Sequence, residues 1–343
     1  MMAPPPEVNG SLVPGFTSWK HLRRNMTPDT LYERLKKMPG FNIRELAWDF
    51  DRENEIGLEM EDEHLAKWIG YHLPREDQWC AIADMLYQED KPDFMAVMFD
   101  GVDKIQHQAW KYIDPALRGE FTDSQGEELK ELCREYYRRL DGYIERLVTA
   151  AGPEAKVFFA SDHGFCATTE VVRINRHLAD LGHLAWKEVE ETDAARRRED
   201  SPFANLDWEN TVAYCPTPSS NGIVIRVARE PGQSGIAPEE YPAFRERLIE
   251  ELYQLKHPEN GEQVITKVMT REDTFPGPAM KLAPDLTLTL RDSGFVSIKN
   301  LEPSVVCRNY PMGTHHMDGV FIAWGAGIRQ GVAAEPLQVT DLT

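Results

Sequence analysis

Short apolar runs alternate with amphipathic helical patterns along most of the chain, and this alternation restricts the fold more than any other feature. The runs at 93–100 and 155–161 predict buried strands, and the run at 319–325 predicts a further strand. Helical patterns cover 61–88 and 124–150, and the second ends at an Ala-Gly-Pro sequence. Strands that alternate with helices predict an α/β fold, with a parallel or mixed sheet covered by helices on both faces.

The remaining elements follow the same pattern. A helix start is predicted at Thr27, with Pro28 in the first turn and Asp29 near the positive end of the helix dipole. Further strands are predicted at 210–215, 221–227, 263–269 and 285–290, and a helix at 238–255. The charged segment at 190–200 has the composition of a solvated loop or helix face.

The acidic composition restricts the partners. The formal net charge is −19, so the surface repels nucleic acid and anionic lipid, and neither is expected as a partner. Hydrophobic residues make up 41% and charged residues 28%, which is typical of a folded globular protein. A small anionic substrate would need local positive charge, and bound metal ions are the usual source of it in an acidic protein.

The cysteines indicate a reducing compartment, and we expect the cytoplasm. The chain has five cysteines, widely spaced and without a CxxC pair, and it is too large to need disulfide bonds for stability. No apolar run approaches the roughly 20 residues of a membrane span. The opening residues contain no basic region followed by an apolar one.

Three short motifs lie beside predicted strand ends, where open α/β sheets place their ligand sites. The first is FDGVDKIQH, in which Asp103 and His107 are four residues apart. One helical turn after the strand would place both side chains on the same face. A carboxylate with an imidazole is a donor pair suited to zinc or another first-row metal.

The second motif is SDHGF, and the third is GTHHMDGV. Asp162 and His163 can both reach one metal only if the chain turns sharply, which Gly164 permits. Of the adjacent His315 and His316, only one is expected to face the same site. Each motif taken alone has an ordinary structural explanation, as a solvated helix, a capped turn or a loop. Three such pairs at sheet edges favour a metal site.

The order of these motifs resembles the alkaline phosphatase superfamily, in particular its type I phosphodiesterase and nucleotide pyrophosphatase branch. The matching pattern is DxxxH after an apolar strand, then SDHG, then GTHxxxGVFIAxGxGI. Connecting segments such as RINRHLADLGHL and FPGPAMKLAPDLTLTL also look like that branch, so the resemblance covers nearly the whole chain. It implies an alkaline-phosphatase-like three-layer sandwich with a mixed, mostly parallel central sheet. It also implies a metal-binding core at 1–177 and 279–343, and a cap at 178–278 that sets substrate specificity.

The resemblance also implies two divalent metal ions, with zinc as the expected metal and manganese as the alternative. Asp103, His107 and His315 would hold one ion, and Asp162 and His163 would belong to the second. His316 is then a neighbour of the site rather than a ligand. Asp100 is either an outer carboxylate or a structural residue at the strand end.

One expected part has no counterpart in the sequence. In the family an Asp at the end of the first strand, and a Thr or Ser nucleophile at the next helix, complete the second metal site. We expect both upstream of PPPEVNG, so no catalytic nucleophile is assigned here and the chain is predicted to be a fragment truncated at both ends. Thr17 and Ser18 do not follow a strand that ends in Asp, and CPTPS at Cys215 does not match the sulfatase motif.

The function implied by the resemblance is metal-dependent hydrolysis of a small phosphoric ester, either a diester or a monoester, with the oligomeric state open. One alternative is a phosphomutase of the same superfamily, which transfers phosphate within a molecule instead of releasing it. The other is a metal-binding domain without catalytic activity, which the unassigned nucleophile favours for this chain alone.

Overall fold

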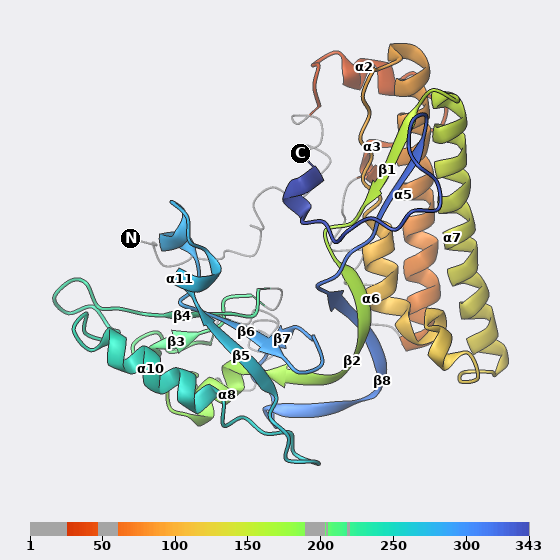
Figure 1. The fold of residues 1–343 in the computed structure, drawn as a ribbon. Coiled ribbons are helices and arrows are strands. Elements are labelled where there is room, and N and C mark those ends of the chain that lie inside the picture. Colours follow the sequence, from red (N-terminus) through yellow and green to blue (C-terminus); the bar gives the residue numbers. More distant parts are fainter. Residues whose placement is uncertain (1–25, 47–60, 189–202, 204, 218–219, 343) are drawn as a thin grey trace. The chain divides into compact units, whose positions relative to one another are not determined.

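The computed structural model describes residues 26–46, 61–188, 203, 205–217 and 220–342, and the chain forms two compact units. The first unit comprises Met1–Phe165 and His316–Thr343, and the second comprises Cys166–His315 (Figure 1). Among the described residues, no helix is both long and apolar enough to cross a membrane. The charged segment at 190–200, Thr17 and Ser18 lie outside the described residues.

Three long helices lie side by side in the first unit: α5 (Glu61–Asp90), α6 (Gly101–Ile113) and α7 (Ser124–Ala151) (Figure 1). The helices predicted at 61–88 and 124–150 are confirmed. The Asp123 side chain caps α7 by accepting a hydrogen bond of 2.7 Å from the Gly126 backbone N–H. The helix ends at Gly152, whose φ of 83° suits glycine.

The core of these helices follows from their apolar stripes. Ile69 of α5, Ile105 of α6 and Leu129 of α7 are each at most 2% exposed and belong to one cluster of buried side chains. Burying a side chain of this size stabilises the fold by roughly 1.5–3 kcal/mol. This packing fixes the orientation of α6 about its own axis, because the face that carries Ile105 must contact α5 and α7.

Two short helices precede α5: α2 (Leu31–Leu35) and α3 (Ile43–Leu46). Leu35 and Leu46 pack with Ile82 of α5 in a second cluster. The prediction of a helix start at Thr27 is wrong by about one turn. Residues 27–30 form turns instead, in which the Leu31 N–H donates to the Pro28 carbonyl over 2.8 Å, and the helix begins only after them.

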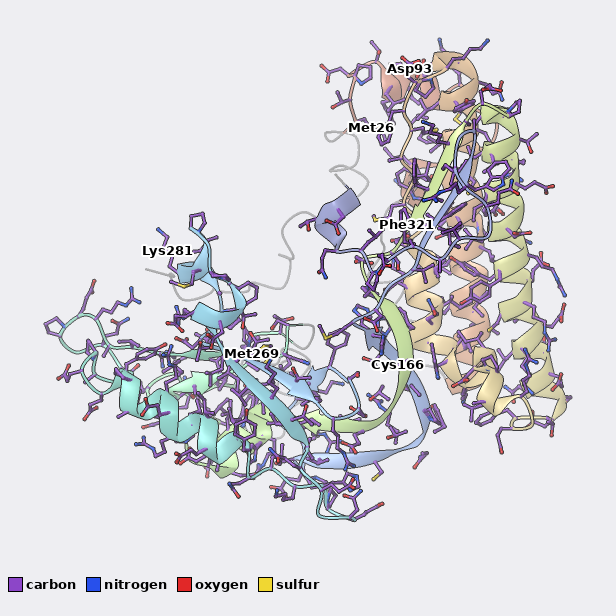
Figure 2. All side chains as sticks on the ribbon, in the orientation of Figure 1. Met26, Asp93, Cys166, Met269, Lys281 and Phe321 are labelled. Atoms are coloured by element: carbon purple, nitrogen blue, oxygen red, sulfur yellow. The ribbon has the colours of Figure 1, made fainter. Side chains whose placement is uncertain are left out.

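A two-stranded antiparallel sheet completes the first unit, formed by β1 (Lys156–Ala160) and β9 (Phe321–Gly325). Phe321 marks the start of β9 in Figure 2. Both predicted strands are confirmed, but the prediction that the strand at 155–161 is buried is wrong: Phe158 is 59% exposed, and Ile322 of the paired strand is 53% exposed. The two short helical segments η1 (Pro115–Leu117) and η3 (Val339–Leu342) also belong to this unit.

The buried strand predicted at 93–100 is wrong. The segment forms no strand, and two of its apolar side chains are almost fully exposed, Phe94 by 83% and Met98 by 88%. An apolar run becomes a buried strand only where other elements cover it, and none of those described in this structure does so.

The second unit contains a four-stranded sheet in the order β3-β4-β6-β5, with antiparallel neighbours. The strands are β3 (Ala213–Tyr214), β4 (Gly222–Ile225), β5 (Ile265–Thr270) and β6 (Leu286–Leu290). The helices are α8 (Ile174–Asp180), α10 (Tyr241–Leu252) and the short α11 (Arg271–Thr274), and η2 (Met280–Leu282) follows (Figure 1). These strands and α10 confirm the predicted elements.

The core of the second unit lies between its sheet and its helices. Ile223 of β4, Leu248 of α10 and Ile265 of β5 are completely buried in one cluster. The side chain of Met269 on β5 lies further along the same strand (Figure 2). The alternating burial of β6, in which every second residue is buried, shows one face of the sheet turned to this core.

A second sheet of the order β7-β2-β8 consists of β2 (Gly164–Arg173), β7 (Val296–Ser297) and β8 (Val305–His316). The β2–β7 pairing is parallel. The expectation of a mostly parallel central sheet is not confirmed, because the pairings of the other two sheets are antiparallel. The overall class, a mixture of helices and several sheets, agrees with the α/β prediction.

Candidate metal centre

The first turns of α6 present Asp103 and His107 on the side of the helix away from its buried stripe. Ile105 and Ala109 are completely buried, and positions two residues from them lie about 200° around the helix. Asp103 and His107 therefore remain partly exposed, with side-chain exposures of 39% and 30%. His107 Nε2 lies 3.5 Å from Asp103 Oδ1, as the four-residue spacing predicts.

The turn after β1 positions Asp162 and His163. Two hydrogen bonds hold this turn against the residue before β9. The Ser161 N–H donates to the Val320 carbonyl over 3.0 Å, and the Val320 N–H donates to Ser161 Oγ over 2.7 Å. His163 Nε2 then lies 3.6 Å from Asp103 Oδ1 and 3.6 Å from Asp162 Oδ1. Asp162 is at the margin of the group, with 85% of its side chain exposed.

The His163 ring is oriented by its other nitrogen. Nδ1 lies 3.0 Å from the Gly164 carbonyl oxygen, which can only accept a hydrogen bond, so in the neutral ring Nδ1 carries the proton. Nε2 then presents a lone pair towards Asp103. An imidazole held by a backbone carbonyl in this way is the usual arrangement of a metal-binding histidine.

Gly164 has a different role from the one predicted. Its φ is not in the left-handed region, but a Cβ at this position would collide with the Asp318 carbonyl oxygen. The glycine is therefore required for the close approach of two chain segments and not for a sharp turn.

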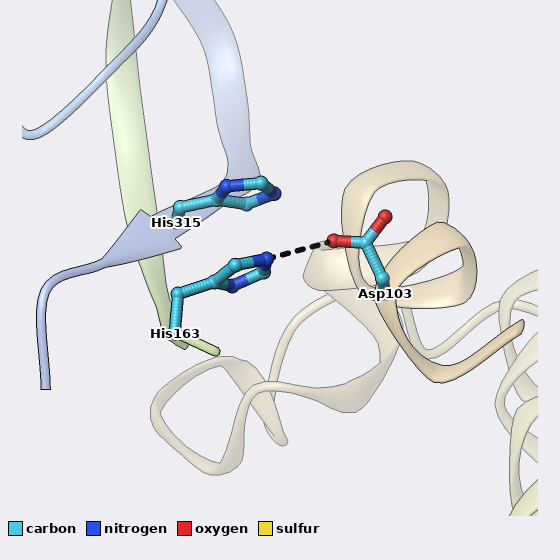
Figure 3. A group of neighbouring side chains, drawn as sticks. All are labelled: Asp103, His163 and His315. Atoms are coloured by element: carbon cyan, nitrogen blue, oxygen red, sulfur yellow. Dashed lines mark ion pairs between the residues drawn. The ribbon is translucent and has the colours of Figure 1, made fainter. Parts of the chain in front are cut away.

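The third motif lies at the end of β8, where the division between the two units falls between His315 and His316. The ligand atoms of Asp103, His163 and His315 lie within 4.8 Å of one another (Figure 3). His316 Nδ1 accepts a hydrogen bond from the Asp318 N–H at 3.1 Å, and 45% of its side chain is exposed. Of the two adjacent histidines, His315 is a member of this group and His316 is not; His107, which was expected beside Asp103 and His315, is not a member either.

An aromatic side chain that the sequence did not single out supports the histidines. The Phe165 ring makes an edge contact with His107 at a centroid distance of 4.8 Å and lies 5.6 Å from His163. Trp110 stacks on Phe165 at 6.1 Å. Phe165 stands two residues after His163, and this position in the SDHGF motif is the only signal that could have identified it.

The carboxylate of Asp100 already interacts with two basic side chains. Its carboxylate accepts a hydrogen bond of 2.7 Å from Lys104 Nζ and forms a 3.5 Å ion pair with Arg75. Burial would raise the pKa of the Asp100 carboxyl, but the hydrogen bond from Lys104 and the charge of Arg75 outweigh it and lower the pKa. These contacts assign Asp100 a structural role at the start of α6.

The side chains present fit a first-row divalent metal ion. One carboxylate oxygen and imidazole nitrogens are the donors that zinc and its neighbours accept, and within the first unit Asp103 Oδ1 lies 3.5 Å from His107 Nε2 and 3.6 Å from His163 Nε2. In addition, Asp103 Oδ1 and the lone pair of His163 Nε2 face each other, an arrangement that a cation between them would stabilise.

Comparison with known families supports this interpretation of the motifs. A family model described as type I phosphodiesterase / nucleotide pyrophosphatase matches residues 15–318. A search of curated proteins and a search of solved structures found no match. Because the matched region covers most of the 343 residues, the chain belongs to the type I phosphodiesterase / nucleotide pyrophosphatase family of the alkaline phosphatase superfamily.

Proposed function

We propose that this protein takes part in metal-dependent hydrolysis of a small phosphoric ester through a two-metal site. The observation that carries the proposal lies within the first unit. Asp103 Oδ1 is 3.5 Å from His107 Nε2 and 3.6 Å from His163 Nε2, in a chain of a phosphodiesterase family. One carboxylate oxygen is thus approached by imidazole nitrogens from two segments that are distant in the sequence.

The assignment of ligands remains part of the proposal. Asp103, His107 and His315 hold one ion, and Asp162 and His163 belong to the other, with zinc preferred over manganese because imidazole donors predominate. The three-layer sandwich, and a cap at 178–278 that selects the substrate, are also proposed. The family membership supports each of these points.

When bound, the ions supply the positive charge that polarises the phosphoryl group and stabilises the leaving oxygen. The side chains of this protein hold and orient that charge. Asp103 contributes the negative charge, and the Gly164 carbonyl keeps His163 Nε2 available by holding the ring proton on Nδ1. Phe165 restricts the rotation of the His107 and His163 rings and shields them from water.

The positive charge of a bound ion would also overcome the repulsion between the acidic protein and an anionic ester. With a formal net charge of −19, the protein repels a phosphate ester at long range. A divalent ion held by partly exposed side chains reverses the sign of the field where the ester must bind.

The test uses bis-p-nitrophenyl phosphate as the diester and p-nitrophenyl phosphate as the monoester, with metal content measured separately. We expect EDTA to remove the bound metal together with any turnover, and zinc or manganese to restore both. Asp103→Asn and His163→Gln should each lower kcat/KM by at least about 100-fold, since they weaken the charge that stabilises the transition state. Asp141→Asn, on the exposed side of α7, is the matched control and should change neither quantity. Unchanged zinc content and turnover in both variants would refute the proposal.

A further inference from the structure

A second group of metal-binding side chains lies entirely within the second unit. It comprises His257, Glu259 and Cys307, and we call it the Cys307 cluster. His257 and Glu259 stand in the turn at 257–262, which is closed by a hydrogen bond of 2.8 Å from the His257 N–H to the Glu262 carbonyl. Cys307 is the third residue of β8. None of these residues belongs to the candidate metal centre.

The geometry of the Cys307 cluster is that of a small coordination shell. The ligand atoms of its three residues lie within 4.8 Å of one another, and Cys307 Sγ is 3.1 Å from His257 Nε2. In a tetrahedral zinc site, bond lengths of about 2.0–2.3 Å place neighbouring ligand atoms about 3.5 Å apart. The observed separations reach that value with side-chain movements of a fraction of an ångström to about 1 Å.

A buried carboxylate beside the cluster provides a separate indication of a cation. Glu170 is 5% exposed, and its Oε1 lies 3.7 Å from His257 Nε2. Its Oε2 is buried and has no hydrogen-bond partner among the described residues. A buried anionic oxygen without a partner is costly, and a nearby metal ion would remove that cost.

The charges around the cluster also favour a cation. Arg291 is the guanidinium that pairs with Glu170 Oε1, with Nε at 2.7 Å, but it pairs with Glu262 as well. The positive charge of Arg291 is therefore shared by two carboxylates, and Glu259 adds a third negative charge. If the Cys307 thiol ionises, a divalent ion is needed to balance the negative charge.

We propose that His257, Glu259 and Cys307 bind one thiophilic divalent metal ion, zinc in the first place, with Glu170 as the fourth side chain within reach. The thiol proton is released to solvent on binding. The ring proton of His257 then resides on Nδ1, so the hydrogen bond of 3.3 Å that Nδ1 accepts from the Glu259 N–H is lost. The three ligands link the turn at 257–262 to β8, and Glu170, whose Oε1 lies 3.7 Å from His257 Nε2, is a further carboxylate nearby.

The experiment uses cobalt as a spectroscopic substitute for zinc, in the Asp103→Asn background, so that the candidate metal centre contributes little. We expect a cobalt–thiolate charge-transfer band that zinc displaces. Cys307→Ser should abolish the band, and His257→Gln should weaken cobalt binding by at least about 10-fold. Cys166→Ser is the matched control, a half-buried thiol of the same unit, and should keep the band. A missing band, or a band that survives in Cys307→Ser, overturns the proposal.

A second measurement avoids dependence on the folding of the variants. Cys307 is exposed, so iodoacetamide can reach it in the unsubstituted chain, and a mildly alkaline buffer supplies the reactive thiolate. Zinc should slow this alkylation by at least about 10-fold, as followed by mass spectrometry. Equal alkylation rates with and without zinc would refute the site. The result is independent of the proposed phosphoesterase activity, which Cys307→Ser should leave metal-dependent.

Discussion

Oδ1 of Asp103 lies 3.6 Å from Nε2 of His163 and thereby joins the first turn of α6 to the turn that follows β1 (Figure 3). Both atoms carry lone pairs when the His163 ring is neutral with its proton on Nδ1. The same carboxylate oxygen faces His107 Nε2 at 3.5 Å. Asp103 is therefore the side chain on which the whole candidate metal centre depends.

The first prediction is that Asp103 and Asp162 contribute unequally to the affinity for zinc. Asp103→Asn should weaken zinc binding by about 10–100-fold or more, because it removes the negative charge shared by two imidazoles. Asp162→Asn should have the smaller effect, since Asp162 is 85% exposed and, among the described residues, forms its ion pair with His163. Competition with a chromophoric chelator measures both affinities, with Asp141→Asn as the control. A larger loss in Asp162→Asn than in Asp103→Asn would contradict this ranking.

The second prediction concerns the pH dependence of stability near the start of α6. Glu76 is 4% exposed, and its burial, together with the negative charge of Asp100, raises the pKa of its carboxyl. A carboxyl with a raised pKa in the folded state destabilises that state as the pH rises above the unfolded pKa of about 4.3. Glu76→Gln removes the ionisation and leaves an oxygen that can still accept from the Gly101 N–H.

We therefore expect Glu76→Gln to raise the free energy of unfolding at pH 8, and to change it little at pH 4, where the wild-type carboxyl is largely protonated in both states. Urea titrations at pH 4, 6 and 8 measure the difference. Loss of stability at pH 8 would show that the charge of Glu76, and not its burial, dominates there.

Local sequence patterns predicted much of the fold correctly. The helical pattern of α5, the amphipathic period of α7 and the alternating LTLTL run of β6 were sufficient to locate these elements. Such patterns are reliable where a single face is buried, because the period of the sequence then matches the period of the backbone. For the same reason the four-residue spacing of Asp103 and His107 was sufficient to place both side chains on one helical face.

Burial by distant elements could not be predicted in the same way. The apolar residues of 93–100 resemble a buried strand, yet Met98 is 88% exposed, because burial depends on which other segments cover the run. The long strands β2 and β8 were missed, since neither has a continuous apolar or alternating pattern. The grouping of His163 with Asp103, rather than with Asp162 alone, likewise depends on how β1 lies beside α6.

The third prediction tests the packing that fixes the start of α6. A Cβ on Gly101 would collide with Tyr136 Oη and with Glu76 Oε1. Gly101→Ala should therefore destabilise the protein by about 1–3 kcal/mol, despite the better helix propensity of alanine. Tyr136 Oη is buried and has no hydrogen-bond partner among the described residues, so Tyr136→Phe should be nearly neutral.

The double variant distinguishes a steric effect from a general loss of structure. Since Tyr136→Phe removes one of the two colliding atoms, it should restore part of the stability that Gly101→Ala loses. A double-mutant cycle from urea unfolding measures this coupling. Additive losses would mean that the hydroxyl group is not the obstacle.

A buried carboxylate holds three elements of the second unit together. Asp285 is 2% exposed and accepts hydrogen bonds from the Ile225 N–H at 2.7 Å and from the Tyr241 hydroxyl at 2.6 Å. It also forms an ion pair with Arg271. The carboxylate thus links β4, the first residue of α10 and the first residue of α11.

The last prediction follows from this arrangement. Asp285→Ala should lower the free energy of unfolding by about 3–5 kcal/mol, because it leaves the charge of Arg271 and a buried N–H without their partner. Asp285→Asn keeps oxygen and nitrogen atoms at the site but loses the charge. Its free energy of unfolding should therefore lie between those of Asp285→Ala and the wild type. Trp208 packs against the core of the second unit, and its fluorescence during urea unfolding can follow the change. The exposed Asp318→Ala should stay within about 0.5 kcal/mol of the wild type. If Asp285→Ala were equally mild, the ion pair and the two hydrogen bonds would together contribute little, and the second unit would depend on its apolar core alone.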